Sequence, residues 1–185
     1  MLKGKKVLLR NVEREDLNTM LSYENDILQR GQWVGLNLTA SNSMEKRFEK
    51  DGYWRNDTGA LLIIDKEDNQ IAGVVGFFVS ISYFEGYEIG FKIYDPNRRN
   101  KGLMTEALSL FSSYIFYIKQ IERLQALSTV GNNAARKVLE KCNFIHEGTL
   151  RRAIFHGGIL HDLDIFSLLR EEAPKFTTFN MKESL

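Results

Sequence analysis

Asp95-Pro-Asn-Arg-Arg-Asn-Lys-Gly-Leu-Met-Thr-Glu-Ala107 is the stretch that decides the fold, because it joins a strand pattern to a helix pattern through a basic turn. An alternating run, residues 87–94, precedes it, and apolar residues with helical spacing follow it. The first N–H groups of a helix have no partner inside the helix, and the helix dipole favours an anion there. Because Arg98, Arg99 and Lys101 surround this end, the turn predicts a site for a pyrophosphate-bearing ligand.

A basic turn of this kind is also often a solvated surface loop, and this stretch alone leaves that alternative open. The glycine patterns G-x-x-x-x-G-K-[ST] and G-x-G-x-x-G, which mark two common kinds of nucleotide site, do not occur in the sequence. The common nucleotide-binding folds therefore fit this chain poorly.

The composition is that of one globular domain without an obvious polyanionic or membrane partner. The 185 residues carry 25 Lys and Arg against 24 Asp and Glu, a balance that does not call for nucleic acid. Cys142 is the single cysteine, so no internal disulfide can form, and this suits a reducing cytoplasm. Neither a signal-peptide pattern nor a membrane-spanning run is present. We expect a cytoplasmic domain over residues 1–172 and a polar tail over 173–185.

Hydrophobic periodicity predicts seven strands and four helices in one α/β (α+β) domain. The element order is β-α-α-β-β-β-α-β-α-β-β, which implies a mixed sheet with helices on both faces. The expected strands are 7–12, 60–65, 70–83, 87–94, 122–130, 144–153 and 160–169, and the expected helices are 13–24, 43–54, the long helix from 103, and 132–142.

A second strand-to-helix junction follows at Asn132. The helix after it buries one face through apolar residues at i, i+3, i+4 and i+7, and Asn132 stands at its N-cap position. Asn132 could be no more than a helix cap. Two consecutive junctions nevertheless favour a binding site, because ligands in open α/β sheets bind beyond the carboxyl ends of the strands.

Four motifs in order resemble the GNAT N-acetyltransferase superfamily, especially the branch with the bacterial ribosomal-protein N-terminal (alanine) acetyltransferases. They are Glu88-Ile-Gly-Phe-Lys-Ile-Tyr94, the run from Arg99 to Ala107, Asn132-x-x-Ala135 with Leu139-Glu-Lys-Cys-Asn-Phe144, and the pair His161-Asp162. The resemblance covers nearly the whole chain. It implies a GNAT-type, mostly antiparallel sheet of six to seven strands, and it allows a homodimer.

The resemblance also implies acetyl-CoA as the acetyl donor, without a metal. The family's pyrophosphate loop reads Arg99-x-x-Gly102-x-Met104 here, with Met104 in place of a second small residue. The backbone of Ile93 and Tyr94 would pair with the pantetheine arm like an added strand, and Asn132 would bind the arm. The expected cofactor-binding residues are Ile93, Tyr94, Arg99, Asn100, Lys101, Gly102, Leu103, Met104, Thr105 and Asn132.

Acetyl transfer to an amine requires a base, because an unperturbed ammonium has a pKa near ~10.4. Glu88 is the candidate, and a solvated glutamate or one paired with Lys92 is the alternative. A backbone N–H around Tyr94 would bind the tetrahedral oxyanion. The resemblance places the usual proton donor for the thiolate at Leu139 or Ala135, which cannot donate. Tyr94 or a water on Asn132 or Asn133 could serve, or the thiolate could leave unassisted.

The acceptor is expected to be a primary amine, either a protein N-terminus or a small amine. Trp33, Tyr53, Trp54 and His161 are candidates for its pocket, although the aromatic residues could be core and His161 an ordinary strand residue. No histidine arrangement indicates a metal. Two alternatives remain: a GNAT-fold module that binds CoA without acetylating, and an unrelated nucleotide-binding protein that prefers ATP.

Overall fold

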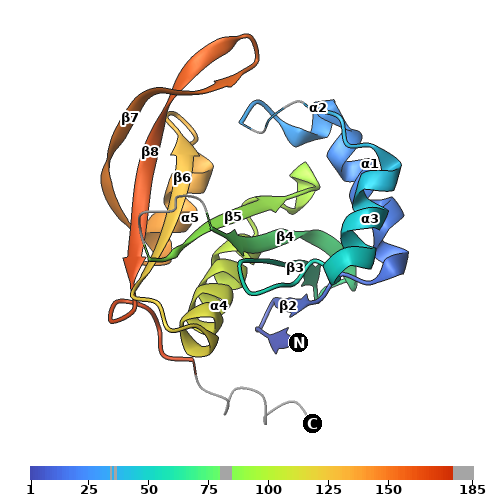
Figure 1. Cartoon of the computed structure of the whole chain (residues 1–185), viewed down its shortest axis with the longest axis horizontal. Coiled ribbons are helices and arrows are strands. Elements are labelled where there is room, and N and C mark those ends of the chain that lie inside the picture. The colour runs from blue at the N-terminus through green and yellow to red at the C-terminus, as the bar shows by residue number, and fades with distance from the viewer. Residues whose placement is uncertain (34, 36, 80–84, 177–185) are drawn as a thin grey trace.

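The computed structural model describes residues 1–33, 35, 37–79 and 85–176. Among these residues eight strands form one sheet in the order β1-β2-β3-β4-β5-β6-β8-β7 (Figure 1). All neighbouring strands are antiparallel except β5 and β6. The strands are β1 (Leu2–Lys3), β2 (Val7–Arg10), β3 (Thr58–Asp65), β4 (Gln70–Phe78), β5 (Tyr87–Ile93), β6 (Arg123–Thr129), β7 (Ile145–His156) and β8 (Ile159–Leu169).

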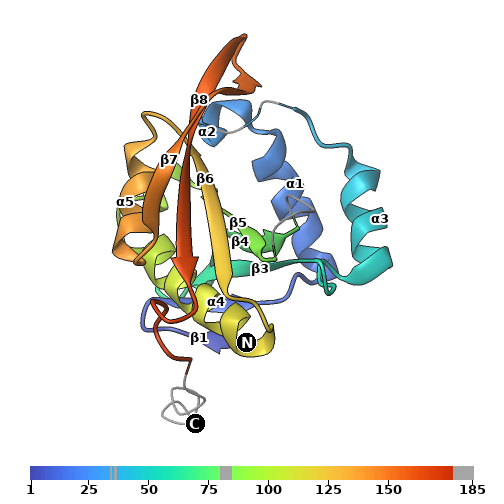
Figure 2. The same ribbon diagram turned by 60° about the vertical axis from the view of Figure 1, so that its left-hand side comes forward.

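Helices cover both faces of the sheet. Successive strand residues point to opposite faces, and in β3 Leu61 packs with α4 and α5 while Leu62 packs with α1 and α3. Figure 2 shows α4 and α5 on one side of the sheet and α1 and α3 on the other. The helices are α1 (Leu17–Asn25), α2 (Ile27–Arg30), α3 (Ser41–Asp51), α4 (Leu103–Ile118) and α5 (Asn133–Lys141), with short 3₁₀ turns η1 (Arg14–Asp16) and η2 (Pro96–Arg98).

The parallel strands β5 and β6 are paired only where they begin. Tyr87 lies opposite Leu124 and Glu88 opposite Gln125, and no further pair joins the two strands in the described part of the chain. Both strands continue beyond this point, to Ile93 and Thr129. Figure 1 shows them starting side by side and then separating. The facing edges of the two strands are therefore left without strand partners along most of β5, and we call this space the β5–β6 gap.

The predicted mixed, mostly antiparallel sheet with helices on both faces is confirmed, with differences at the ends of elements. The sheet has eight strands rather than six to seven because Leu2–Lys3, too short to show periodicity, pairs with β2. The predicted helix 43–54 ends at Asp51, where Gly52 adopts a left-handed conformation that stops it. The predicted strand 70–83 reaches Phe78, and its residues 80–83 lie outside the described part.

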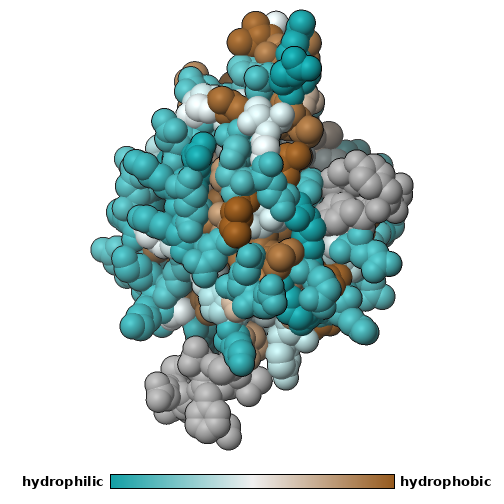
Figure 3. Space-filling view, turned by 90° about the vertical axis from the view of Figure 1, so that its left-hand side faces the viewer, coloured by the Kyte–Doolittle hydropathy of each residue, from teal (hydrophilic) through white to brown (hydrophobic). Residues whose placement is uncertain are grey.

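The β7–β8 hairpin is longer than predicted and projects from the body of the sheet (Figure 1). The alternation of β7 is interrupted by a register shift between Leu150 and Ile154 and by a positive φ at Arg152. The strand predicted from alternation therefore ends at residue 153. Exposed apolar residues near the hairpin turn include Phe155 and Ile159, and Figure 3 shows apolar surface at this tip.

Candidate active site

The predicted phosphate-binding turn forms a tight loop before α4. Asp95 caps η2 by accepting from the Asn97 N–H at 2.8 Å, and the chain then reverses at Asn100 and Gly102, with φ values of 61° and 82°. Gly102 is the N-cap of α4 and has no side chain with which to cap that helix end. Backbone N–H groups around left-handed residues converge into anion-binding concavities. The loop therefore presents N–H groups at the positive end of a 16-residue helix dipole.

The basic residues of the loop have different roles. Arg98 is held by Asp65 at 3.0 Å and Asp68 at 2.6 Å, so the expectation that it adds charge for a phosphate is wrong. It fastens the loop to the end of β3 instead, and its hydrogen bond lowers the pKa of the Asp68 carboxyl. Arg99 donates to the Gln29 carbonyl of α2 at 2.9 Å and remains exposed.

The N-terminal segment reinforces the start of α4. The Glu106 carboxylate accepts the backbone N–H groups of Lys5, Lys6 and Val7 at 2.7, 2.7 and 3.0 Å. The Lys6 ammonium donates to the Lys101 carbonyl at 2.9 Å. These contacts bring an additional cation to the loop that the sequence pattern did not reveal, because its partners lie about a hundred positions away.

Beyond Glu88, the edge of β5 that faces the gap has no strand partner among the residues that the structure describes. The Tyr94 N–H donates to the Ala72 carbonyl at 2.9 Å. Because backbone groups alternate in direction along an antiparallel pair, those of Phe91 and Ile93 point away from β4 and into the β5–β6 gap. This geometry suits the predicted backbone role of Ile93. The Tyr94 N–H is itself occupied by β4, and the role of a backbone N–H around Tyr94 as the oxyanion donor stays a prediction.

Glu88 lies where the two strands separate. Its side chain is 9% exposed, and its Oε2 atom is buried without a hydrogen-bond partner among the described residues. Lys92, considered as its partner, forms an ion pair with Glu24 of α1 instead. Gly90, on the same strand face between them, is exposed. An unpartnered carboxylate beside open surface can accept a proton or bind an ammonium group.

The Tyr94 side chain points to the face covered by α1. Its ring stacks on Tyr23 with centroids 4.9 Å apart. Burial, and then the nearby Glu24 carboxylate, raise the pKa of the Tyr94 phenol far above its usual value. The phenol therefore keeps its proton at neutral pH.

Asn132 caps α5 as predicted, with its Oδ1 accepting the Ala135 N–H at 3.2 Å. Leu139, further along α5, is fully buried. The preceding residue, Gly131, has a φ of 93°, and a Cβ placed there would lie 3.2 Å from the Trp33 ring. Trp33 thus lies against the start of α5, at the end of β6.

The predicted acceptor residues do not gather in one place. Tyr53 is buried with α1 and α3, and its hydroxyl is 3.4 Å from the Met44 carbonyl. Trp54 packs on the opposite sheet face, edge-on to Phe77 at 5.3 Å between ring centroids. His161 lies in the β7–β8 hairpin, stacked on His156 with centroids 3.8 Å apart. Among the four, Trp33 lies next to Gly131 and Asn132, and Tyr53 belongs to the cluster beneath α1.

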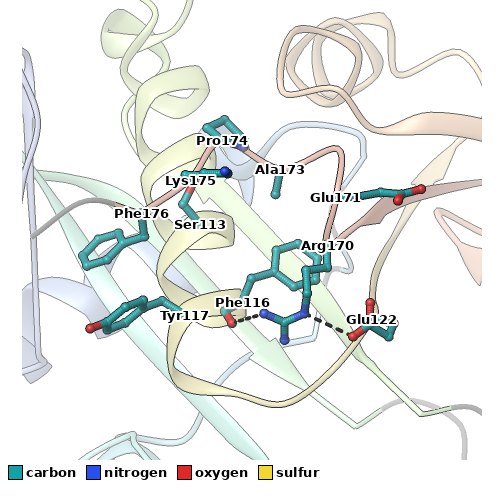
Figure 4. Close-up of a pocket in the computed structure, with 10 residues that line it drawn as sticks. All are labelled: Ser113, Phe116, Tyr117, Glu122, Arg170, Glu171, Ala173, Pro174, Lys175 and Phe176. Carbon is teal, nitrogen blue, oxygen red and sulfur yellow. Dashed lines mark hydrogen bonds and ion pairs between the residues drawn. The ribbon is translucent and has the colours of Figure 1, made fainter.

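A surface pocket of about 510 Å³ lies elsewhere, at the C-terminal end of α4 (Figure 4). Arg170 closes that helix end by donating to the carbonyls of Phe116 and Lys119 at 2.7 Å each. Ala173 and Phe176 of the predicted polar tail also line this pocket and pack against the core. The pocket is separated from the loop at Gly102 by the length of α4, so it is not part of the candidate site.

The described residues contain no group of three or more His, Cys, Asp or Glu side chains arranged to hold a metal ion. None of their helices is both long and apolar enough to cross a membrane.

The fold is that of N-acetyltransferases of known structure. The ribosomal-protein-S5-alanine acetyltransferase from Vibrio fischeri aligns with a TM-score of 0.79, covering 93% of this chain and 97% of that chain at 18% identity. Spermidine N-acetyltransferase from Vibrio cholerae, solved in complex with CoA and spermine, aligns with a TM-score of 0.78, covering 91% and 98% at 20% identity. Identities this low show the shared fold alone.

The family model for the acetyltransferase (GNAT) domain matches residues 6–145, and the chain therefore belongs to the GNAT acetyltransferase family. A relative named as the uncharacterized N-acetyltransferase YoaA of Bacillus subtilis is 25% identical over 176 residues, covering 92% of this chain and 97% of that protein. The predicted family is confirmed, as is the predicted enzyme class, an acetyl-CoA-dependent N-acetyltransferase.

Proposed function

We propose that this protein transfers the acetyl group of acetyl-CoA to a primary amine by direct attack in a ternary complex. The observation that carries the proposal is the β5–β6 gap, which runs from the loop at Gly102 to the buried carboxylate of Glu88. A pyrophosphate at one end and a reacting thioester at the other would place the donor and the base along the same strand edge.

The coenzyme would be held mainly by backbone groups. Its pyrophosphate would accept N–H groups of the loop and first turn of α4, formed by Arg99, Asn100, Lys101, Gly102, Leu103, Met104 and Thr105. The pantetheine arm would pair with the gap-facing edge of β5 at Ile93, as an added strand does. Met104 is 7% exposed and belongs to the core, so its side chain is turned away from the phosphate.

Glu88 would act as the general base. It takes the proton of the amine, directly or through a water, while the amine nitrogen bonds to the acetyl carbon and the carbon–sulfur bond breaks. Its exposed neighbour Gly90 leaves room for an acceptor on that strand face. General base catalysis of this kind typically contributes about 10²- to 10⁴-fold.

The proposed acceptor is a primary amine, either a small amine or a protein N-terminus. The aligned structures include an enzyme named for spermidine and one named for a ribosomal protein. Trp33 and Tyr53 are proposed as walls of the acceptor site, because they lie next to the end of β6 and in the cluster beneath α1. Trp54 and His161 lie apart from them, and their predicted roles stay predictions, as do the homodimer and the cytoplasmic location.

The test is an acetyl-transfer assay with purified protein, acetyl-CoA and a panel that includes spermidine and an alanine-ended peptide. Release of free thiol that depends on the amine supports the proposal. The alternative, a CoA-binding module without transferase activity, is favoured by Leu139 and Ala135, where a proton donor was expected. Coenzyme binding without amine-dependent thiol release, across the whole panel, would support that alternative.

A further inference from the structure

The proposed reaction creates a charge that needs stabilisation. When the carbon–sulfur bond breaks, its electron pair stays on sulfur as a thiolate. Neither Leu139 nor Ala135 has a side chain that can donate a hydrogen bond to that sulfur. Tyr94 keeps its proton, but its ring lies on the α1 face of the sheet, stacked on Tyr23.

Ser128 of β6 has a buried hydroxyl that forms no hydrogen bond within the described part of the chain. The residue is 7% exposed, and its Oγ atom has no hydrogen-bond partner among the residues that the structure describes. Buried hydroxyl groups are normally paired, because an unpaired one has lost its hydrogen bonds to water. This hydroxyl is therefore available to a partner from outside the described residues.

Strand geometry places Ser128 beside the β5–β6 gap. It lies on β6 between Gln125, where β5 and β6 are last paired, and Asn132, which caps α5. Leu124 and Ala126 of the same strand pack in the core with α4 and α5, and by alternation the Ser128 side chain points to that same face. The Glu88 side chain points to the opposite face, as Lys92 and Tyr94 do, so a thioester held between β5 and β6 at the level of the sheet would have Glu88 on one face and Ser128 on the other.

We infer that the Ser128 Oγ–H donates a hydrogen bond to the departing thiolate of the coenzyme. This inference rests on the proposed function. Ser128 keeps its proton throughout: the amine proton goes to Glu88, the electron pair of the broken bond stays on sulfur, and the thiolate takes up a proton from water after the amide has formed. A donor fixed before the reaction stabilises charge at the point where it develops.

Ser112 of α4 provides a matched control. It is also a fully buried serine whose Oγ has no partner among the described residues, but it lies within a helix rather than beside the gap. Ser128→Ala and Ser112→Ala each remove one unpaired hydroxyl, so neither change should lower the melting temperature appreciably.

The experiment measures acetyl transfer and, separately, the thiol pKa of bound CoA by ultraviolet titration of the thiolate. For Ser128→Ala we expect kcat to fall about 10- to 100-fold with little change in the KM for acetyl-CoA. The pKa of the bound thiol should rise by about one unit or more, because the thiolate has lost a donor. Ser112→Ala should leave both quantities as in the wild type. If Ser128→Ala does not fold, Ser128→Cys keeps a weaker donor of similar size and should give smaller shifts in the same direction.

Unchanged kcat and thiol pKa in the Ser128 variant would overturn the inference while leaving the proposed function intact. Equal losses in the Ser128 and Ser112 variants would also overturn it, since a packing effect would then explain both. A wild-type protein that binds no CoA would overturn the proposed function together with the inference.

Discussion

Lys92 of β5 forms an ion pair with Glu24 of α1 and so leaves Glu88, four residues earlier on the same strand face, without a cationic partner among the described residues. The pairing ties α1 to the far end of β5, while Glu88 stays at the point where β5 and β6 separate. On β5, Lys92 thus serves to hold α1, and the Glu88 carboxylate is left available to accept a proton.

Glu88→Gln should lower kcat by about 10²-fold or more at neutral pH, because the amide cannot accept the amine proton. Calorimetric affinity for CoA should not change, since the coenzyme is proposed to bind the backbone of β5 and α4. Glu24→Gln is the matched control and should affect stability more than kcat. Retention of full turnover by Glu88→Gln would assign the base to another group.

Gly102→Glu should abolish coenzyme binding, because a carboxylate would face the phosphates at the start of α4. The substitution also strains a residue whose φ is 82°, so a control for strain is required. Gly52→Ala, at the end of α3 with a φ of 57° and open space around it, provides that control. It should cost about 1 kcal/mol of stability and leave coenzyme affinity unchanged.

Arg98 and Arg99 are adjacent but should differ in what they affect. Arg98→Met breaks contacts to Asp65 and Asp68, with the Asp65 side chain only 4% exposed, so the melting temperature should fall clearly. Arg99→Met removes an exposed side chain near the proposed phosphate site and should raise the KM for acetyl-CoA at nearly unchanged stability. Thermal unfolding and steady-state kinetics on both variants test this difference. A stable Arg98→Met variant with a raised KM, together with an unstable Arg99→Met variant, would contradict the roles given to the two arginines.

Glu147 should make the fold sensitive to acid. Its hydrogen bond to Arg123 lowers the pKa of this carboxyl from an ordinary value of 4.5 to about 2. Because the folded pKa is the lower one, the stabilisation is present above about pH 5 and is lost as the pH falls toward 2. Its size should be about 1 kcal/mol, since solvent screens a side chain that is 39% exposed. Denaturant unfolding of Glu147→Gln between pH 2 and pH 6 should show a correspondingly weaker pH dependence.

The sequence predicted the parts of the fold that depend on local periodicity. The strand–loop–helix unit from Tyr87 to Ile118 and the cap at Asn132 are examples, because alternation, helical spacing and capping are all local signals. The strand Leu2–Lys3 and the four-residue helix α2 were missed, since neither is long enough to show a period.

The site was less predictable because its decisive contacts join distant segments. Lys92 pairs with Glu24 across 68 positions and Lys6 reaches Lys101 across 95, and no local pattern indicates either contact. The separation of β5 and β6 is likewise a tertiary feature. Ser128 could have been noticed as a polar residue on the core-facing side of a predicted strand, a placement that is unfavourable unless it has a partner.

A crystal structure of the protein with bound CoA tests the central claim most directly. We expect the diphosphate on the N–H groups at the start of α4, the pantetheine arm beside Ile93 in the β5–β6 gap, and the sulfur between Glu88 and Ser128. A coenzyme bound at another surface, with this gap unchanged, would contradict the account.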